Sequence, residues 1–264
     1  MPECHAVRVV SSAAEFKPSQ GICYLEIDIK VKELLGTGHL KPSNSHCPLS
    51  TISVLSQYTP FNMAPIRVGI IGLSSSKHTG HAGTWAVSTH LPALQNLPEY
   101  EVVALANSTV ESAKKSIAAH NLPATTKAYG TPEDIANDPD VDLVVVSVQV
   151  QKHYQLAKPA LLAKKKVFVE WPLAVTIDEV EELAKLAKDG NLKTAVGSQS
   201  RAAPAVQKLK EIVSSGQLGK IISSTVVASL GNIPTEVWPE ELSYYLEASS
   251  GGNEYTIAFG HCKF

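Results

Sequence analysis

Short apolar runs alternate with helical patterns along most of the chain after residue 65. The first run, IRVGIIGL at residues 66–73, is almost continuously apolar, which is typical of a strand covered on both faces. Comparable runs follow at residues 101–107, 142–148, 166–170 and 193–198. Because a helical pattern separates each run from the next, we expect parallel strands joined by right-handed crossovers. The pattern therefore predicts an α/β fold with a doubly wound parallel sheet.

Capping residues indicate where two of the helices begin. Thr176 and Glu179 have the spacing of a capping box, in which each side chain bonds a backbone N–H group of the other residue. The helix over residues 109–120 is expected to be capped by Asn107 or Ser108, whose side-chain oxygens suit the first free backbone donors. Both helices then begin shortly after a strand, as a doubly wound fold requires.

Composition divides the chain into three segments. Residues 1–62 carry scattered Ser, Pro and Cys with one possible strand at residues 23–31, and we expect a disordered leader or an extension ahead of a natural start at Met63. Residues 63–195 hold the alternating pattern and are expected to form a dinucleotide-binding domain. Residues 196–264 open with a helix and a strand, which predicts the beginning of a second, α+β domain that is truncated.

Charge and hydropathy exclude several classes of protein. The formal net charge is -2 and no basic block occurs, which argues against a surface for DNA or RNA. No apolar run approaches the roughly 18 residues of a membrane-spanning helix, and the first residues lack the apolar core of a secretory signal. We therefore expect a globular protein without direct contact to nucleic acid or membrane.

Cysteine usage and histidine spacing argue against a disulfide framework and against a metal site. The four cysteines contain no C-x-x-C pair, and a reducing compartment, cytoplasmic or nuclear, is the simplest location. These cysteines are Cys4, Cys23, Cys47 and Cys262. His78, His81 and His90 lie in or just after a glycine-rich loop without carboxylates, so no metal site is expected.

The turn after the first strand is the candidate phosphate loop. In a doubly wound sheet the backbone N–H groups at this turn, together with the helix dipole, form an anion site. The usual fingerprint is G-x-G-x-x-G, and this chain keeps Gly72 but has Ser74 at the second glycine. We expect Gly72, Leu73, Ser74 and Ser75 to contact a diphosphate. The alternative is that Gly69 and Gly72 are only packing glycines.

The second strand ends in Asn107, followed by Ser108 and Thr109. An acid at this position usually bonds the adenosine ribose of NAD and repels the 2′-phosphate of NADP. The neutral Asn107 removes that repulsion, so NAD and NADP both remain possible cofactors. These three residues are predicted to contact the ribose, and the alternative is that Asn107 and Ser108 only cap a helix.

Several motifs occur in the order known from one protein family. They are RVGIIGL, THLPAL, EVVALANST, KKVFVEWPLA, GSQSRAAPAVQKLKEIVSSGQLGKI and SSGGNEYTIAFGH. Together they resemble the glucose–fructose oxidoreductase/inositol dehydrogenase (Gfo/Idh/MocA) family from about residue 66 to residue 261. The resemblance implies a Rossmann domain that binds NAD or NADP, and then an open antiparallel sheet that carries the substrate. Because that sheet often mediates dimers in the family, a homodimer is expected for the full-length form.

Two positions at which this family carries catalytic groups hold inert side chains. The usual triplet is Glu-Lys-Pro, and this chain has Glu170, Trp171 and Pro172. An indole has no titratable proton near neutral pH and cannot replace an ammonium in proton transfer. Matching the catalytic His to His261 puts Ile257 where an Asp is usual. Glu170 is expected to orient a ribose or an amide, Trp171 to stack on a flat ring, and His261 remains a catalytic candidate.

Further residues are expected beside the cofactor. They are Trp85, Ser147, Val148 and His153.

The combination of GLS, TH, VEWPLA and FGH is closer to the branch of the family that contains the fungal galactose-regulon repressor. That resemblance implies a regulator that binds a dinucleotide and a transcriptional activator. The alternative is an NAD(P)-dependent sugar or polyol dehydrogenase that uses His261, Tyr154 or a water in place of the lysine. A third possibility is a fragment without function, because much of the substrate sheet is missing.

Overall fold

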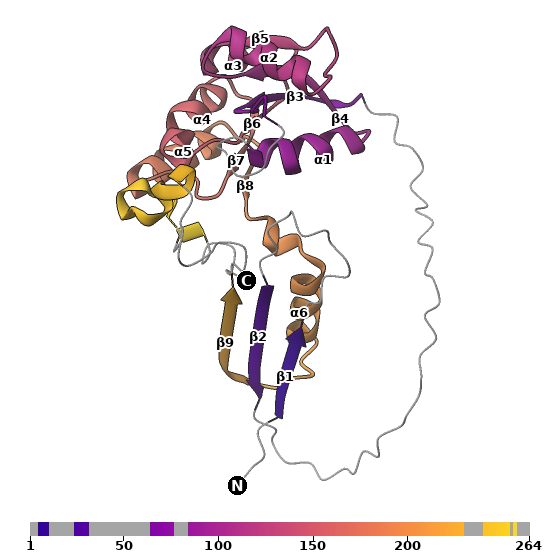
Figure 1. Ribbon diagram of the computed structural model, residues 1–264. Coiled ribbons are helices and arrows are strands. Elements are labelled where there is room, and N and C mark those ends of the chain that lie inside the picture. The colour runs from indigo at the N-terminus through magenta and orange to yellow at the C-terminus, as the bar shows by residue number, and fades with distance from the viewer. Residues whose placement is uncertain are drawn as a thin grey trace. The chain divides into compact units, whose positions relative to one another are not determined.

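The structure is a computed structural model that describes residues 5–10, 24–31, 64–76, 84–229, 240–253 and 256–257 (Figure 1). The chain divides into two compact units, which we describe separately. One unit holds residues 64–206 and 233–264, and the other holds residues 1–63 and 207–232. This division differs from the one expected from composition, because it joins part of the C-terminal segment to the N-terminal segment.

The larger unit is built on a six-stranded parallel sheet with strand order β5-β4-β3-β6-β7-β8. Within this sheet the chain passes first through β3, continues outward to β4 and β5, and then returns to β6 on the other side of β3. This order confirms the predicted doubly wound sheet and puts its switch point beside β3. The strands are β3 (Ile66–Ile71), β4 (Tyr100–Ala106), β5 (Lys127–Tyr129), β6 (Leu143–Val146), β7 (Lys166–Glu170) and β8 (Thr194–Gly197).

Helices follow the strands along this unit. They are α1 (Leu91–Asn96), which continues a π-helical turn η1 (Ala86–His90), α2 (Val110–Ala119), α3 (Pro132–Asn137), α4 (His153–Leu162) and α5 (Ile177–Asp189). Short 3₁₀ turns are η2 (Val150–Lys152), η3 (Gln199–Ala202), η4 (Glu240–Leu246) and η5 (Ala248–Ser250). Helix α5 has the predicted capping box between Thr176 and Glu179.

The predicted cap of α2 was wrong. Thr109 caps this helix, and its hydroxyl accepts the Ser112 N–H at 3.0 Å. Neither Asn107 nor Ser108 takes that role, because Thr109 is the residue with the extended backbone that precedes the first helical turn. The amide of Asn107 has other partners, which belong to the functional site.

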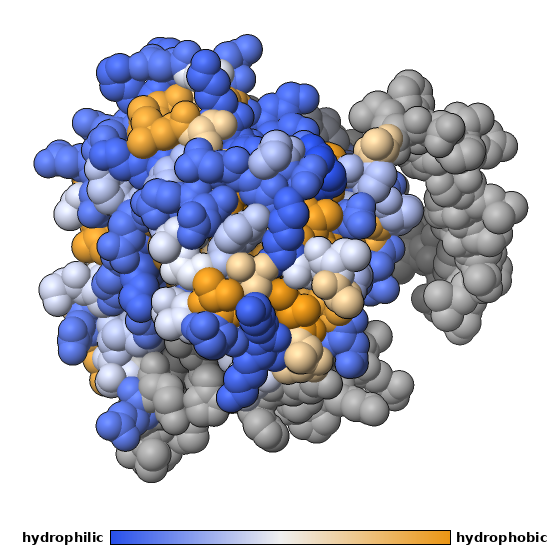
Figure 2. Space-filling view, turned by 90° about the horizontal axis from the view of Figure 1, so that it is seen from above, coloured by the Kyte–Doolittle hydropathy of each residue, from blue (hydrophilic) through white to orange (hydrophobic). Residues whose placement is uncertain are grey.

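Side chains of the central strand alternate between two cores, one on each face of the sheet. Val68 and Ile70 pack with Leu105 and with residues of α1 and α2, whereas Ile71 packs with Val146 and with residues of α3 to α5. Both faces of the sheet are therefore covered, as the continuous apolar runs predicted. Full burial of one such side chain is worth about 1.5–3 kcal/mol. The face shown in Figure 2 is mainly hydrophilic where it is coloured, with smaller hydrophobic patches.

A network of charged side chains closes the end of the sheet at which β3 and β6 begin. Arg67 donates to Asp142 at 3.0 Å and to Asp140 at 2.9 Å. Lys127 donates to Asp138 and Asp140 at 2.8 Å each. Every charge in this network has a partner of opposite sign, so it stabilises the fold and leaves little capacity for a ligand.

The smaller unit contains a three-stranded antiparallel sheet with order β1-β2-β9. Its strands are β1 (His5–Val10), β2 (Tyr24–Val31) and β9 (Ile221–Ser229), and α6 (Pro204–Ser214) precedes β9. The possible strand at residues 23–31 is present as β2, while β1 was not predicted. Pairing of β2 with β9 links segments far apart in the sequence. This pairing explains why the two compact units differ from the segments expected from composition.

Candidate functional site

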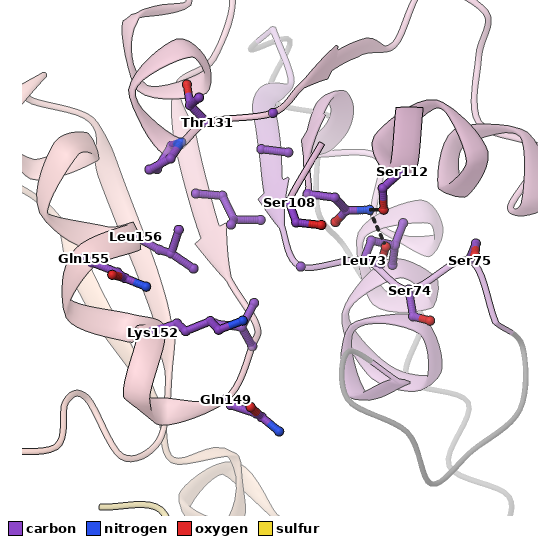
Figure 3. A pocket seen from close by; sticks show the side chains of 17 residues that line it. Leu73, Ser74, Ser75, Ser108, Ser112, Thr131, Gln149, Lys152, Gln155 and Leu156 are labelled. Carbon is purple, nitrogen blue, oxygen red and sulfur yellow. Dashed lines mark hydrogen bonds between the residues drawn. The ribbon is translucent and has the colours of Figure 1, made fainter. Parts of the chain in front are cut away.

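A cavity of about 480 Å³ opens at the carboxyl ends of β3, β4 and β6 (Figure 3). The residues that line it come from the loop after β3, the end of β4, the turn before α3, and the start of α4. They are Ile71, Gly72, Leu73, Ser74, Ser75, Ala106, Asn107, Ser108, Ser112, Gly130, Thr131, Pro132, Val148, Gln149, Lys152, Gln155 and Leu156. The cavity thus lies at the switch point, where open α/β sheets bind their ligands.

The loop after β3 turns sharply at Gly72, whose φ is +100°. A Cβ atom at this position would overlap the carbonyl oxygen of Ser147 and the side chain of Val148. Glycine is therefore required both by the left-handed backbone and by the close approach of the loop to the end of β6. The backbone of the loop can approach a ligand closely for the same reason.

Side chains from the end of β4 and from α2 hold the carbonyl groups of this loop. The carbonyl oxygen of Leu73 accepts from Asn107 Nδ2 at 3.0 Å and from Ser116 Oγ at 2.8 Å. The carbonyl oxygen of Ser74 accepts from His120 Nε2 at 2.7 Å. Two successive carbonyl groups are thus fixed toward α2.

The N–H groups of these two peptide groups point the other way and have no partner among the described residues. In a trans peptide the N–H group points away from the C=O group, so the Ser74 and Ser75 N–H groups point away from the side chains that hold the carbonyls. Among the described residues, the N–H groups of Leu73, Ser74 and Ser75 have no hydrogen-bond partner. Consecutive unpaired N–H groups at such a turn form an anion site.

The charge of the cavity also favours an anion. Of the described residues that line it, Lys152 is the only charged one, and none is an acid. Figure 3 shows Lys152 reaching from the wall that carries Gln149 and Gln155 toward the wall that carries Ser74. Lys152 has no ion pair in the described part of the chain. The sequence prediction missed Lys152, although its place just after β6 at the ligand-binding edge was a usable signal.

The structure brings many of the predicted cofactor residues to the cavity and places others away from its wall. Gly72, Leu73, Ser74, Ser75, Asn107, Ser108 and Val148 line it. Thr109, Ser147, Trp85, His153, Glu170 and Trp171 do not. Ser147 is buried, with its N–H bonded to the Ile71 carbonyl, and Trp85 is 45% exposed in the helical turn before η1. The cofactor roles of all these residues remain predictions.

His153 is buried behind Val148, a residue of the cavity wall. Its Nδ1 atom lies 2.7 Å from the carbonyl oxygen of Pro172, and its Nε2 atom lies 3.0 Å from that of Val148. Burial lowers the pKa of His153, although both carbonyl contacts act in the opposite direction. His153 thus lies between the end of β6 and the turn after β7, outside the residues that line the cavity, and its contact with a cofactor remains a prediction.

Trp171 is engaged by the C-terminal segment of the same unit. Its indole Nε1–H donates to the carbonyl oxygen of Thr256 at 2.9 Å. That carbonyl belongs to the peptide group joining Thr256 to Ile257, so the Trp171 side chain contacts the backbone directly before Ile257. The Thr256 hydroxyl in turn donates to the carbonyl oxygen of Gly251 at 2.9 Å. The peptide bond between Trp171 and Pro172 is cis.

The Glu170 carboxylate lies within hydrogen-bonding distance of His90 Nε2, and the His90 ring also packs edge-on against Phe168 with centroids 5.3 Å apart. Tyr154, a candidate substitute for the missing lysine, donates its hydroxyl hydrogen to Glu182 at 2.5 Å and accepts from Lys158 at 2.8 Å. These contacts join α4 to α5, and Tyr154 does not line the cavity. Its catalytic use remains a prediction.

Other candidates lie outside the described residues, namely His78, His81 and His261. Within the described ranges, no group of three His, Cys, Asp or Glu side chains is arranged to hold a metal ion. In the same ranges, no helix has the length and apolar character needed to cross a bilayer.

Comparison with known proteins agrees with this geometry. The family described as "Oxidoreductase family, NAD-binding Rossmann fold" matches residues 66–198. The chain belongs to this Gfo/Idh/MocA oxidoreductase family. The family described as "Gal80p, C-terminal domain" matches residues 204–263. Both the predicted family and the predicted branch are thereby confirmed.

Curated relatives of this family member include both an enzyme and regulators. The chain is 37% identical to dehydrogenase aclE of Aspergillus oryzae over 196 residues, which cover 74% of this chain and 52% of that protein. It is 32% identical to the galactose/lactose metabolism regulatory protein GAL80 of Saccharomyces cerevisiae over 207 residues, which cover 76% of this chain and 46% of that protein. The chain thus spans about half the length of the curated relatives it matches.

Solved structures of Gal80p have the same fold. A super-repressor mutant of Gal80p from Saccharomyces cerevisiae aligns with a TM-score of 0.62 and 29% identity over 75% of this chain and 51% of that chain. The transcriptional regulator Gal80p from Kluyveromyces lactis aligns with a TM-score of 0.59 and 30% identity over 75% of this chain and 48% of that chain.

Proposed function

We propose that this protein binds NAD or NADP in the cavity after β3 and acts as a cofactor-sensing regulator with little redox activity. The observation that carries the second part is the position of Trp171. By the resemblance to the family, Trp171 stands at the position of the usual lysine, and its N–H group donates to the Thr256 carbonyl. An indole in this arrangement holds the C-terminal segment in place and offers no proton for transfer at neutral pH.

The cavity suits a dinucleotide in several respects. The N–H groups of Leu73, Ser74 and Ser75, which have no partner among the described residues, would donate to the diphosphate, and Lys152 would add a positive charge. Gly72 lets the backbone approach the ligand without a side chain between them. When bound, the cofactor's nicotinamide ring would supply hydride chemistry, and the chain's own residues would bind and orient the molecule.

The names of two relatives support a protein partner. Because the Gal80p relatives are described as regulators of galactose and lactose metabolism, we propose a transcriptional activator as the protein partner. A homodimer of the full-length protein and a cytoplasmic or nuclear location belong to the same proposal.

A dehydrogenase is the second candidate, because the relative aclE is described as one. Such an enzyme would have the side chains of Glu170, directly before Trp171, and of its partner His90 close to the position of the family's usual lysine. In this second case the substrate would be a small sugar or polyol.

The test combines binding with turnover. Wild-type protein should bind NAD or NADP by isothermal titration calorimetry and produce no NAD(P)H from a panel of sugars and polyols. Trp171→Lys combined with Ile257→Asp restores the two family groups and should raise NAD(P)H production, whereas Trp171→Phe should not. Brisk turnover by the wild type would contradict the regulator and favour the dehydrogenase.

A further inference from the structure

We propose that Asn107 is a positioning residue that builds the phosphate loop through its amide N–H₂ group. The inference rests on the proposed dinucleotide binding. It assigns to Asn107 a role that an acid at the end of β4 could not fill.

The hydrogen bonds of Asn107 require an amide donor. Its Nδ2 atom lies 3.0 Å from the Leu73 carbonyl oxygen, 3.1 Å from Ser116 Oγ and 3.4 Å from Ser112 Oγ. A carbonyl oxygen only accepts hydrogen bonds, so the nitrogen side of the amide must face Leu73. The Oδ1 atom has no partner among the described residues and remains free to accept from a ribose hydroxyl.

Ser116 works with Asn107. Its side chain is 1% exposed, and its hydroxyl donates to the Leu73 carbonyl at 2.8 Å while accepting from Asn107. The two residues thus hold one carbonyl group from two directions. Through the planar peptide group, they fix the direction of the Ser74 N–H group, which is one of the three free donors of the loop.

A carboxylate introduced by Asn107→Asp would reverse this arrangement. The carboxylate oxygens and the Leu73 carbonyl oxygen would face each other, and both can only accept hydrogen bonds. The Ser116 hydroxyl would then donate to the charged carboxylate, which is a stronger acceptor than the carbonyl. The Leu73 carbonyl would then lose both donors. Adding the acid that usually binds the NAD ribose should therefore weaken the phosphate loop.

The cofactor preference follows from the same residue. None of the described residues lining the cavity is an acid, Lys152 is positive, and the groups beside Asn107 are hydroxyls such as those of Ser108 and Ser112. A 2′-phosphate would meet hydrogen-bond donors and no negative charge from this wall, so the repulsion that normally excludes NADP is missing. We expect the wild-type dissociation constants for NAD and NADP to agree within about tenfold.

Calorimetric titration of the full chain with NAD and with NADP tests the inference. Asn107→Asp should weaken NAD binding by roughly tenfold or more and weaken NADP binding further, because the lost donor and the added charge act together. Ser116→Ala should weaken both nucleotides equally, by about three- to tenfold. Asn191→Asp, the same chemical change on an exposed turn outside the cavity, should leave both affinities unchanged.

The pH dependence gives a readout that general damage would not produce. Protonation of the introduced carboxyl group restores an O–H donor, so NAD affinity of Asn107→Asp relative to wild type should rise as pH falls from about 6 to about 4. His120, bound to the Ser74 carbonyl, and Lys152 also carry titratable groups at the loop and cavity, and the parallel wild-type titration corrects for them.

Three outcomes would overturn the inference. If folded Asn107→Asp binds NAD as tightly as wild type or more tightly, Asn107 does not act as a donor to the loop. If Asn107→Asp does not fold and Ser116→Ala binds both nucleotides like wild type, the carbonyl clamp has no role in binding. If wild type binds neither nucleotide, the proposed function fails and this inference fails with it.

Discussion

The two ends of the parallel sheet use polar groups in opposite ways. At the amino ends of β3 and β6, Arg67, Asp142, Asp140, Lys127 and Asp138 satisfy one another. At the carboxyl ends, a glycine turn and three side chains from the neighbouring strand and helix leave backbone donors without partners among the described residues. Unpaired donors are costly unless water or a ligand satisfies them. The comparison indicates that one end of the sheet stabilises the fold and that the other end is built for a ligand.

Gly72→Ala should have the largest effect on the carboxyl end. The added Cβ would overlap the Ser147 carbonyl, and alanine would have to adopt the left-handed backbone conformation of residue 72. Together these effects should lower the free energy of unfolding by roughly 3 kcal/mol and remove dinucleotide binding. Urea unfolding and calorimetric titration measure the two effects. Gly216→Ala is the matched control, because Gly216 has φ +73° with no atom near its Cβ position, and should cost only about 1 kcal/mol without affecting binding.

Acid should act on the amino end of the sheet. Hydrogen bonds from Arg67 lower the pKa of Asp142 to about 2, and Lys127 lowers the pKa of Asp140. These carboxylates stay charged to lower pH in the folded than in the unfolded chain, so their stabilisation is present above about pH 4 and is lost as pH falls toward about 2. Urea midpoints measured across this range should fall steeply, and Asp142→Asn should reduce the slope. An unchanged slope in that variant would mean that the ion pair does not contribute.

Asp138→Asn should destabilise the fold and leave the cavity intact. Burial alone would raise the pKa of Asp138, but hydrogen bonds from Lys127, the Asp140 N–H and Tyr129 lower it overall. Neutralising this carboxylate leaves Lys127 with a weaker partner and should cost about 2 kcal/mol. Nucleotide affinity, measured on protein that is still folded, should match wild type. A matching loss of affinity would show that the two ends of the sheet are coupled.

Lys152→Gln should have the smallest effect. Removing the one charge on the described cavity wall should weaken NAD binding by about three- to tenfold and reduce its dependence on salt, because the lysine is exposed and screened. Titration at low and high salt separates this charge effect from a change of shape. Lys188→Gln, an exposed lysine of α5, is the control that should change neither quantity.

The sequence was sufficient for five of the six strands of the parallel sheet and for one wall of the site. Buried strands such as β3 and β6 show as continuous apolar runs, and the glycine turn and Asn107 follow from their places after strands. Strand β5 has only three residues and carries no periodic signal, so it was missed. The hydrogen bond of Trp171 was not predictable either, because its partner Thr256 lies 85 residues away in the sequence. The donor role of Asn107 depends on the Leu73 carbonyl, which lies 34 residues earlier in the sequence and approaches the amide only in the folded chain.

Hydrogen exchange with and without dinucleotide tests the central claim most directly. If the diphosphate binds the free N–H groups of Leu73, Ser74 and Ser75, saturating NAD or NADP should slow amide exchange in the peptide that contains them. Peptides from the amino end of the sheet, around residues 138–142, should be protected much less. Protection that is confined to the amino end, or absent after β3 despite saturating nucleotide, would contradict the account.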